Sequence, residues 1–284
     1  MAIRPDLLLA HAFPETRQHY AKRDAILYAL GLGLGADPTN ATDLPFLLED
    51  RLETLPTFAV TLGAVGMWIR APQFGVDFAK LVHYEQASEF HEPLPPEGEI
   101  VAEARVAAVR DRGEGKGALV EVERVIRDAA SQALYCRLRQ TLLLRADGGF
   151  GGAPAAHQPS LIPERPPDAF TAFPIDRRAA LIYRLSGDWN PLHAVPEAAS
   201  RAGFERPILH GLASYGVAAV AVSRALGLSP IQVKRLDCRF SGVVFPGDEL
   251  SFRIWRVDGG AVFQAFVSER KALDQGRIAF AGAA

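Results

Sequence analysis

Cysteine and methionine are scarce in this chain, whose 284 residues include only two of each. The two cysteines, Cys136 and Cys238, are too few for the disulfide framework of a small secreted domain. Both fall in segments typical of strands, so we expect two buried, reduced thiols. No group of cysteines and histidines has the spacing of zinc ligands, and no metal site is predicted.

An excess of one charge and a long apolar run are also missing. The 31 Lys and Arg residues nearly balance 33 Asp and Glu residues, which argues against nucleic-acid and membrane-surface partners. The most apolar window, residues 212–228, is interrupted by Ser214, Ser223 and Arg224, and it falls short of the roughly 20 apolar residues of a membrane span. The apolar patch at residues 7–10 is too short for a signal-peptide core, and the last four residues carry no peroxisomal address. We therefore expect a cytoplasmic protein.

The remaining composition is that of a globular protein, and it contains an internal repeat. Hydrophobic residues make up 49% of the chain, which is long enough for two domains. Residues 23–31 resemble residues 178–185 at an offset of 155, with apolar residues at helical spacing in both. A Pro/Gly/Glu turn leads into a strand later in each half, at residues 96–100 and 246–250. The chain is therefore interpreted as two copies of one module.

Each copy is predicted to contain a second, longer apolar helix and a set of strands. The long helices are expected at residues 55–68 and 209–226, and neither has a strong polar face, so both should be buried. Alternation predicts a further strand in which Leu236, Cys238 and Phe240 point inward. The other predicted strands cover residues 100–109, 118–126, 132–144, 250–257, 261–267 and 276–281.

A Gly/Pro-rich segment at residues 148–168 is predicted to link the two modules. It separates an N-terminal module, residues 1–147, from a C-terminal module, residues 169–284. The fold class is α+β, with a long helix wrapped by an antiparallel sheet in each module. Two such sheets could join edge to edge, which would cover exposed strand edges.

Chemistry is predicted for residues 183–193, which read YRLSGDWNPLH. Asp188 and His193 stand five residues apart around an Asn-Pro turn, so both side chains can face one pocket and share a water. Eighteen residues after His193, Gly211 begins the long apolar helix, where its N–H and the helix dipole can stabilise an enolate-like oxygen. A base, an acid and such a donor are what adding water to an activated carbonyl compound requires.

Simpler interpretations compete with this one. The Gly-Asp-x-Asn-Pro stretch could be an ordinary capped turn, and a lone His193 is more often structural than catalytic. Ser186 and Ser214 lack a Gly-x-Ser-x-Gly elbow, which argues against a serine hydrolase. The glycines of residues 31–35 follow a helix and not a strand, so we reject a dinucleotide loop. We interpret His210 as a packing or capping residue.

Residues 183–193, followed by residues 198–200, resemble the signature of the hydratase 2 family within the MaoC-like dehydratases. The resemblance covers nearly the whole chain and extends to the hydratase 2 domains of peroxisomal multifunctional enzymes. It implies a double hotdog fold, hydration of trans-2-enoyl-CoA to (R)-3-hydroxyacyl-CoA, and no metal or redox cofactor. Other stretches that look like this family are residues 28–31, 55–58, 148–152, 165–168 and 207–212.

The resemblance also assigns site residues. It implies Asp188 and His193 as the catalytic pair and Gly211 as the oxyanion donor. Tyr84 stands where the family usually has glycine, and Arg112 replaces the more usual lysine while keeping the charge for a CoA phosphate. The implied substrate-binding residues are His83, Tyr84, Arg112, Asn190, Phe240 and Glu49, of which Glu49 aligns with an important glutamate.

The first module has no Asp/His pair in residues 32–38, so we expect it to hold the acyl chain instead. Leu62, Val65 and Trp68 are candidates for lining that slot, with plain core packing as the alternative. Straight-chain, branched and steroid-type acyl groups all stay compatible with this scheme. The rival functions are a hotdog acyl-CoA thioesterase and a non-catalytic acyl-CoA-binding subunit, and a homodimer is expected.

Overall fold

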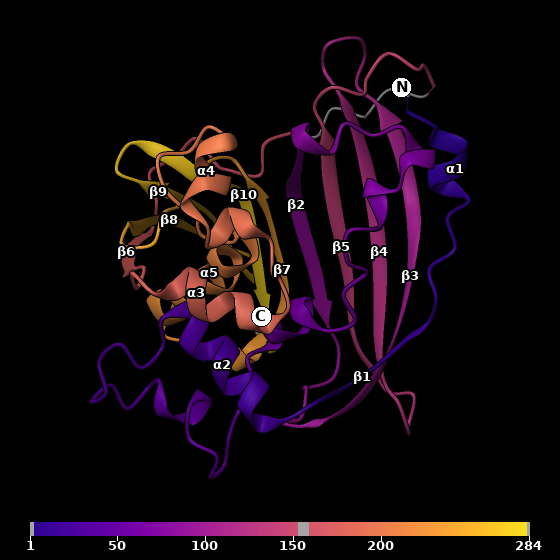
Figure 1. Ribbon diagram of the computed structural model, residues 1–284. Coiled ribbons are helices and arrows are strands. Elements are labelled where there is room, and N and C mark those ends of the chain that lie inside the picture. The colour runs from indigo at the N-terminus through magenta and orange to yellow at the C-terminus, as the bar shows by residue number, and fades with distance from the viewer. Residues whose placement is uncertain (1–2, 153–158, 283–284) are drawn as a thin grey trace.

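The computed structural model describes residues 3–152 and 159–282, and its main feature is one antiparallel sheet of ten strands (Figure 1). The strand order is β1-β3-β4-β5-β2-β7-β10-β9-β8-β6. The strands are β1 (Thr16–Tyr20), β2 (Leu81–Phe90), β3 (Gly98–Asp111), β4 (Ala118–Asp128), β5 (Leu134–Leu144), β6 (Ala169–Pro174), β7 (Val233–Phe240), β8 (Glu249–Val257), β9 (Gly260–Val267) and β10 (Arg270–Phe280). The α-helices are α1 (Pro5–Leu9), α2 (Lys22–Leu32), α3 (Ala179–Tyr183), α4 (Pro196–Arg201) and α5 (Gly211–Ala225).

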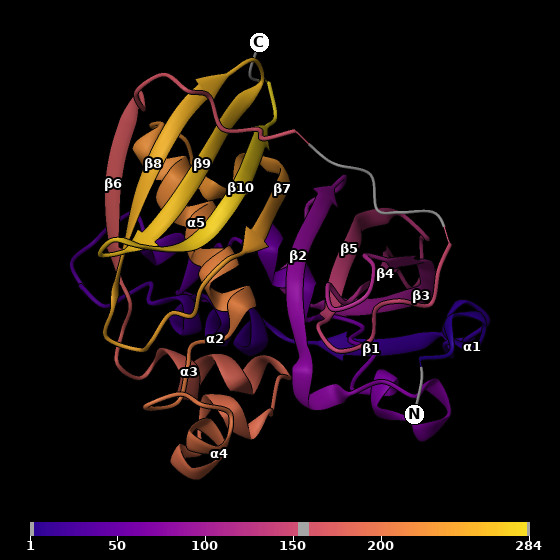
Figure 2. The same cartoon turned by 90° about the horizontal axis from the view of Figure 1, so that it is seen from above.

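The two halves of the sheet have equivalent strand orders, which read outward from the centre as β2-β5-β4-β3-β1 and β7-β10-β9-β8-β6. Five strands come from each half of the chain, and β2 of the first half pairs with β7 of the second. Figure 2 shows the two halves meeting at this seam. Each module alone would leave a long strand edge unpaired, and the β2–β7 pairing covers both edges. The predicted double hotdog class and the edge-to-edge junction are therefore confirmed.

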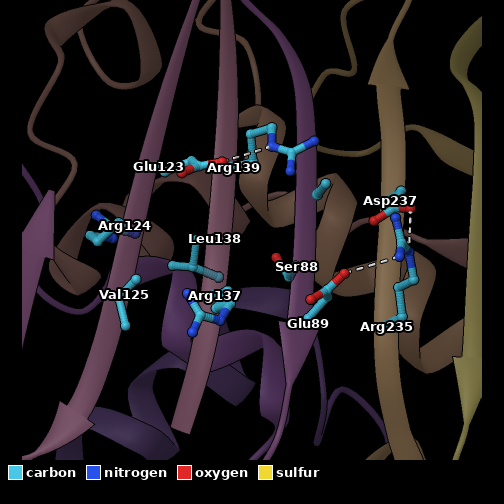
Figure 3. Close-up of a pocket in the computed structure, with 11 residues that line it drawn as sticks. Ser88, Glu89, Glu123, Arg124, Val125, Arg137, Leu138, Arg139, Arg235 and Asp237 are labelled. Carbon is cyan, nitrogen blue, oxygen red and sulfur yellow. Dashed lines mark hydrogen bonds and ion pairs between the residues drawn. The ribbon is translucent and has the colours of Figure 1, made fainter. Parts of the chain in front are cut away.

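Ion pairs cross the seam on the face of the sheet that points away from α5. Glu89 on β2 bonds Arg235 on β7 at 3.0 Å, and Glu85 bonds Arg239 at 2.7 Å. Figure 3 shows a hollow on this face, lined mainly by charged side chains of β4, β5, β2 and β7. Because Leu236 is buried and its neighbour Arg235 is not, strand alternation separates this charged face from the core.

Helix α5 is the buried centre of the second module, as predicted. All eleven residues from Ala213 to Ser223 are buried, and most are small or β-branched, which lets the sheet approach closely. The strands from β7 to β10, with β6 at the edge, curve around α5 (Figure 2). The hydroxyl of Tyr215 on α5 lies 2.7 Å from the carbonyl oxygen of Leu236, which fixes the helix against β7.

The two repeated helices pack on each other, beside α5. The rings of Tyr28 on α2 and Tyr183 on α3, equivalent positions in the repeat, lie 5.8 Å apart. A Cβ atom on Gly31 would come within 3.0 Å of the Cα atom of Tyr183. Glycine at this position therefore allows the close contact between the helices that carry the two copies of the motif.

The prediction of a long helix at residues 55–68 is wrong. The chain forms a short 3₁₀ helix, η2 (Pro56–Thr61), and then turns at Gly63 and Gly66, whose φ angles are +58° and +63°. A Cβ atom on Gly63 would lie 2.3 Å from the Cβ atom of Ala102, so the segment is pressed onto β3. Apolar residues at helical spacing were the only helical signal, and the positive φ angles at two glycines override it.

Three strands had no clear sequence signal. β1 and β6 are short edge strands, and β2 combines polar and apolar residues without alternation. The linker prediction partly falls outside the described residues, and its described parts, residues 148–152 and 159–168, contain no helix or strand. Cys136 and Cys238 are buried and unpaired, as predicted. None of the helices in the described ranges is long and apolar enough to cross a membrane.

Candidate active site

Two short turns hold the predicted catalytic pair together. Asp188 follows Gly187, whose φ of +110° ends the helical turn after α3. The Oδ1 atom of Asp188 accepts the N–H of Asn190 at 3.1 Å, and Oδ1 of Asn190 accepts the N–H of Leu192 at 3.1 Å. These two side-chain bonds fold the chain back, so Oδ2 of Asp188 lies 4.0 Å from Nε2 of His193.

The hydrogen bonding of His193 identifies its free nitrogen. Nδ1 lies 2.9 Å from the carbonyl oxygen of Ile208, which can only accept, so Nδ1 carries the proton. Nε2 therefore has a free lone pair on the side of Asp188. The residue is buried, and burial lowers the pKa of His193. A neutral imidazole with Nε2 free beside a carboxylate is suited to act as a general base.

Gly211 offers a backbone N–H directly after His210, whose ring stacks on that of His193. It is the first residue of the 15-residue helix α5, and the first N–H groups of a helix have no intrahelical acceptor. A Cβ atom on Gly211 would lie 3.3 Å from the ring of Phe240. Glycine therefore lets the ring of Phe240 pack directly on the start of α5, where the positive end of the helix dipole adds to the N–H.

The seam between the modules brings His83 and Phe240 to the same place. Their rings lie 4.8 Å apart, and Phe240 in turn contacts Gly211. Nε2 of His83 bonds the carbonyl oxygen of Glu85 at 3.1 Å, while Nδ1 lies 3.3 Å from the amide nitrogen of Gln140. Burial lowers the pKa of His83 to about 4, so its ring is neutral near pH 7. Because both ring nitrogens already have partners in the protein, the neutral ring offers a ligand its face and its C–H edge.

The other predicted binding residues lie in less enclosed positions. Tyr84 occupies a bulge in β2, and the guanidinium of Arg239 lies 5.0 Å above its ring. Arg112 is exposed in the turn between β3 and β4, and Glu49 is exposed in the loop after the 3₁₀ helix Leu44–Phe46. Within the described part of the chain, no side-chain hydrogen bond or ion pair connects these three to Asp188 or His193. Their roles stay predictions.

His210 has a larger part in the site than the sequence indicated. Its side chain does not cap α5. Instead, Nε2 lies 3.2 Å from the carbonyl oxygen of Asp188, and its ring stacks on the ring of His193 at 3.8 Å. The only signal in the sequence was its position directly before Gly211.

Asp188, His193 and His210 each offer an atom within 4.8 Å of the others, which is a spacing that can hold a metal ion. The two imidazole planes, however, are stacked with an interplanar angle of 26°. Ring lone pairs lie in the ring planes, so those of stacked rings run side by side and do not converge on one ion at about 2.0 Å. The arrangement fits acid/base chemistry and not metal binding.

Comparison with known proteins identifies relatives along almost the whole chain. The family model described as "MaoC like domain" matches residues 159–275, and the one described as "MFE-2 hydratase 2 N-terminal domain" matches residues 18–146. The peroxisomal enoyl-CoA hydratase 2 of Arabidopsis thaliana is 38% identical, over 93% of this chain and 91% of its own. The 3-hydroxyacyl-thioester dehydratase Y of Mycobacterium tuberculosis is 39% identical, over 99% of both chains.

The fold comparison agrees with the sequence comparison. The crystal structure of a MaoC-like dehydratase from Phytophthora capsici superposes with a TM-score of 0.82 and 31% identity, covering 98% of this chain and 99% of the other. Both the sequence match and the superposition thus extend over nearly the whole of this chain and of its relative.

Proposed function

The chain belongs to the MaoC-like dehydratases of the hydratase 2 type, and we propose that it reversibly hydrates trans-2-enoyl-CoA to (R)-3-hydroxyacyl-CoA. The chain is thus an enzyme of the hydratase/dehydratase class. The observation that carries the proposal is the Asp188–His193 pair, with a 4.0 Å gap between Oδ2 and the unprotonated Nε2. A water can sit at hydrogen-bond distance, about 2.8 Å, from both atoms across such a gap.

In the proposed reaction, Asp188 orients the water and His193 takes one of its protons. The water oxygen then forms a bond to C3 of the substrate, and the C2=C3 double bond becomes an enolate. His193 returns the proton to C2, which restores the neutral imidazole and completes the addition of water. Dehydration is the same sequence in reverse. Carboxylate, imidazole and backbone N–H supply every group that the scheme needs, so we expect no cofactor.

Gly211 stabilises the negative charge that forms on the thioester oxygen. Its N–H lies at the start of α5, where the helix dipole favours an anion, and it costs no reorganisation when the charge develops. The ring of Phe240 packs beside Gly211, and the ring of His83 packs on Phe240 from β2 of the first module. Asn190, which caps the turn before His193, holds the loop that carries both catalytic side chains.

We propose that the first module accommodates the acyl chain, because its equivalent loop lacks an acid/base pair. The slot residues predicted from the sequence differ in their surroundings. Leu62 is 1% exposed and belongs to the main core, which supports plain packing for that residue. Trp68 is half-buried and packs on the rings of His11, Phe13 and Phe74. A homodimer and a cytoplasmic location stay predictions.

The proposal is tested by mixing the purified protein with trans-2-decenoyl-CoA. Loss of the conjugated enoyl absorbance, with (R)-3-hydroxydecanoyl-CoA identified by chiral chromatography, is the expected result. Formation of the (S)-product would overturn the stereochemical part of the proposal. If the absorbance persists with decenoyl-CoA and with branched and ring-bearing enoyl-CoAs, the catalytic proposal is wrong, and bound enoyl-CoA would then point to a binding subunit.

A further inference from the structure

We infer that His210 is a positioning residue that holds both members of the acid/base pair, an inference that rests on the proposed hydratase function. His210 is 1% exposed and directly precedes Gly211 at the start of α5. It therefore adjoins the oxyanion donor along the chain and contacts Asp188 and His193 in space. No other residue within the described ranges bonds the backbone of Asp188 through its side chain and also stacks on His193.

The first contact ties the exposed catalytic loop to the buried helix. The side chain of Asp188 is 46% exposed, and its described hydrogen bond, to the N–H of Asn190, is local to the turn. Because a carbonyl oxygen only accepts, the 3.2 Å contact shows that Nε2 of His210 donates to Asp188. This bond spans 22 residues and is the one that fixes the backbone of Asp188 relative to α5.

The second contact fixes the plane of the general base. The single bond from Nδ1 of His193 to Ile208 restrains one atom of the ring, and the ring can still tilt about it. His210 lies flat against that ring, with centroids 3.8 Å apart and an interplanar angle of 26°. Tyr183 packs on His210 at 4.9 Å. The stack therefore restrains the tilt and keeps Nε2 of His193 directed at the position of the water.

The neutral state of His210 is part of this role. Burial, followed by the neighbouring His193, lowers the pKa of His210 to about 4. His210 is therefore uncharged at neutral pH and does not oppose the positive charge that His193 gains when it takes a proton. Its Nδ1 is buried, and among the described residues it has no hydrogen-bond partner. The residue thus supports the pair through Nε2 and its ring face.

The experiment compares His210→Gln with His210→Asn. The side-chain amide of Gln reaches about as far as Nε2 of histidine, whereas that of Asn reaches only to the Nδ1 position. Both variants lose the ring, so their main difference is whether the side-chain amide reaches the carbonyl oxygen of Asp188. We expect kcat to fall about 10- to 100-fold more for His210→Asn than for His210→Gln, with KM within about threefold of wild type in both, since small misplacements of a catalytic group have this effect.

Equal kcat values for the two variants, or a change confined to KM, would overturn the inference. Glu197→Gln serves as the control, because it changes an exposed acid on the neighbouring helix α4 that has no contact with His210 in the described structure. If His210→Asn does not fold, His210→Phe replaces it, since phenylalanine keeps the stack and lacks the donor. Wild-type turnover is measured in parallel, so that failure of the hydratase proposal is separated from failure of the positioning role.

Discussion

Nδ1 of His193 lies 2.9 Å from the carbonyl oxygen of Ile208, and this contact decides which nitrogen is free for catalysis. It joins the Asn-Pro turn to the segment just before α5. The same segment continues into His210 and Gly211. The general base, its stacking partner and the oxyanion donor are thus attached to one short stretch of backbone, which keeps their mutual distances fixed.

Removing either member of the pair should abolish turnover without unfolding the protein. We expect Asp188→Asn and His193→Gln each to lower kcat by about 10²- to 10⁴-fold, because each removes a proton-transfer or water-orienting group. Circular dichroism and thermal unfolding should stay close to wild type for Asp188→Asn, whose side chain is half-exposed. Glu197→Gln, at an exposed acid on the neighbouring helix α4, is the matched control. Wild-type-like turnover in either active-site variant would show that the shared-water scheme is wrong.

Gly211→Ala should lower kcat because the new Cβ atom crowds Phe240. The added atom would lie 3.3 Å from the ring, so the ring or the helix start must shift by a few tenths of an ångström. We expect a loss of about tenfold or more in kcat. The double variant Gly211→Ala with Phe240→Leu relieves the contact and should recover part of the loss. Full activity in Gly211→Ala alone would contradict the expected crowding, because it would show that the added methyl group does not move the N–H of residue 211.

Activity and stability should both fall on the acidic side of neutrality. Burial lowers the pKa of His193, so the acid limb of kcat/KM should have its midpoint below the ordinary histidine value of about 6.5. Rate measurements between pH 4 and 9 test this, and a midpoint above the ordinary value would contradict it.

The free energy of unfolding should also fall as the pH falls. His83 and His210 are buried as neutral rings, with pKa values lowered to about 4, so the unfolded state binds protons at a higher pH than the folded state. The stability that these two neutral histidines contribute is complete above pH 6.5, which is about the pKa of histidine in the unfolded chain. It is lost as the pH falls from there towards 4. Within this pH range, each of these histidines should lower the free energy of unfolding by up to about 1.4 kcal/mol for every pH unit of acidification. Urea unfolding at several pH values measures the slope, and His83→Gln should reduce it.

Asp43→Asn should destabilise the attachment of the loop after α2. The carboxylate of Asp43 is 6% exposed, pairs with Arg224 near the end of α5, and accepts the N–H of Gly35. Asparagine can still accept that bond but leaves Arg224 without its counter-charge. We expect a loss of about 1–3 kcal/mol in the free energy of unfolding. The control is Asp37→Asn, which changes an exposed aspartate of the same loop and should leave the free energy of unfolding nearly unchanged. Similar losses in both variants would show that the ion pair between Asp43 and Arg224 has no particular effect on stability.

The sequence predicted the parts of the site that are contiguous. Residues 183–193 form their geometry through bonds between near neighbours, so the motif could be interpreted directly. The contact from His210 to Asp188 depends on how α5 lies against the loop, and no local pattern encodes it. The helix of the first module was wrongly predicted because the prediction rested on the helical spacing of apolar residues and ignored Gly63 and Gly66, where the chain turns. Strand β2 was missed because polar side chains also lie on its buried face, so its sequence does not alternate between polar and apolar residues.

The most direct test of the central claim is the fate of oxygen-18 from labelled water during turnover of trans-2-decenoyl-CoA. A hydratase places one labelled oxygen on C3 of the product and leaves the thioester intact. Mass spectrometry should find that label in the wild-type product, and Asp188→Asn should form almost none. Label found instead in a free carboxylic acid, together with released CoA, would identify a thioesterase and contradict the hydratase mechanism.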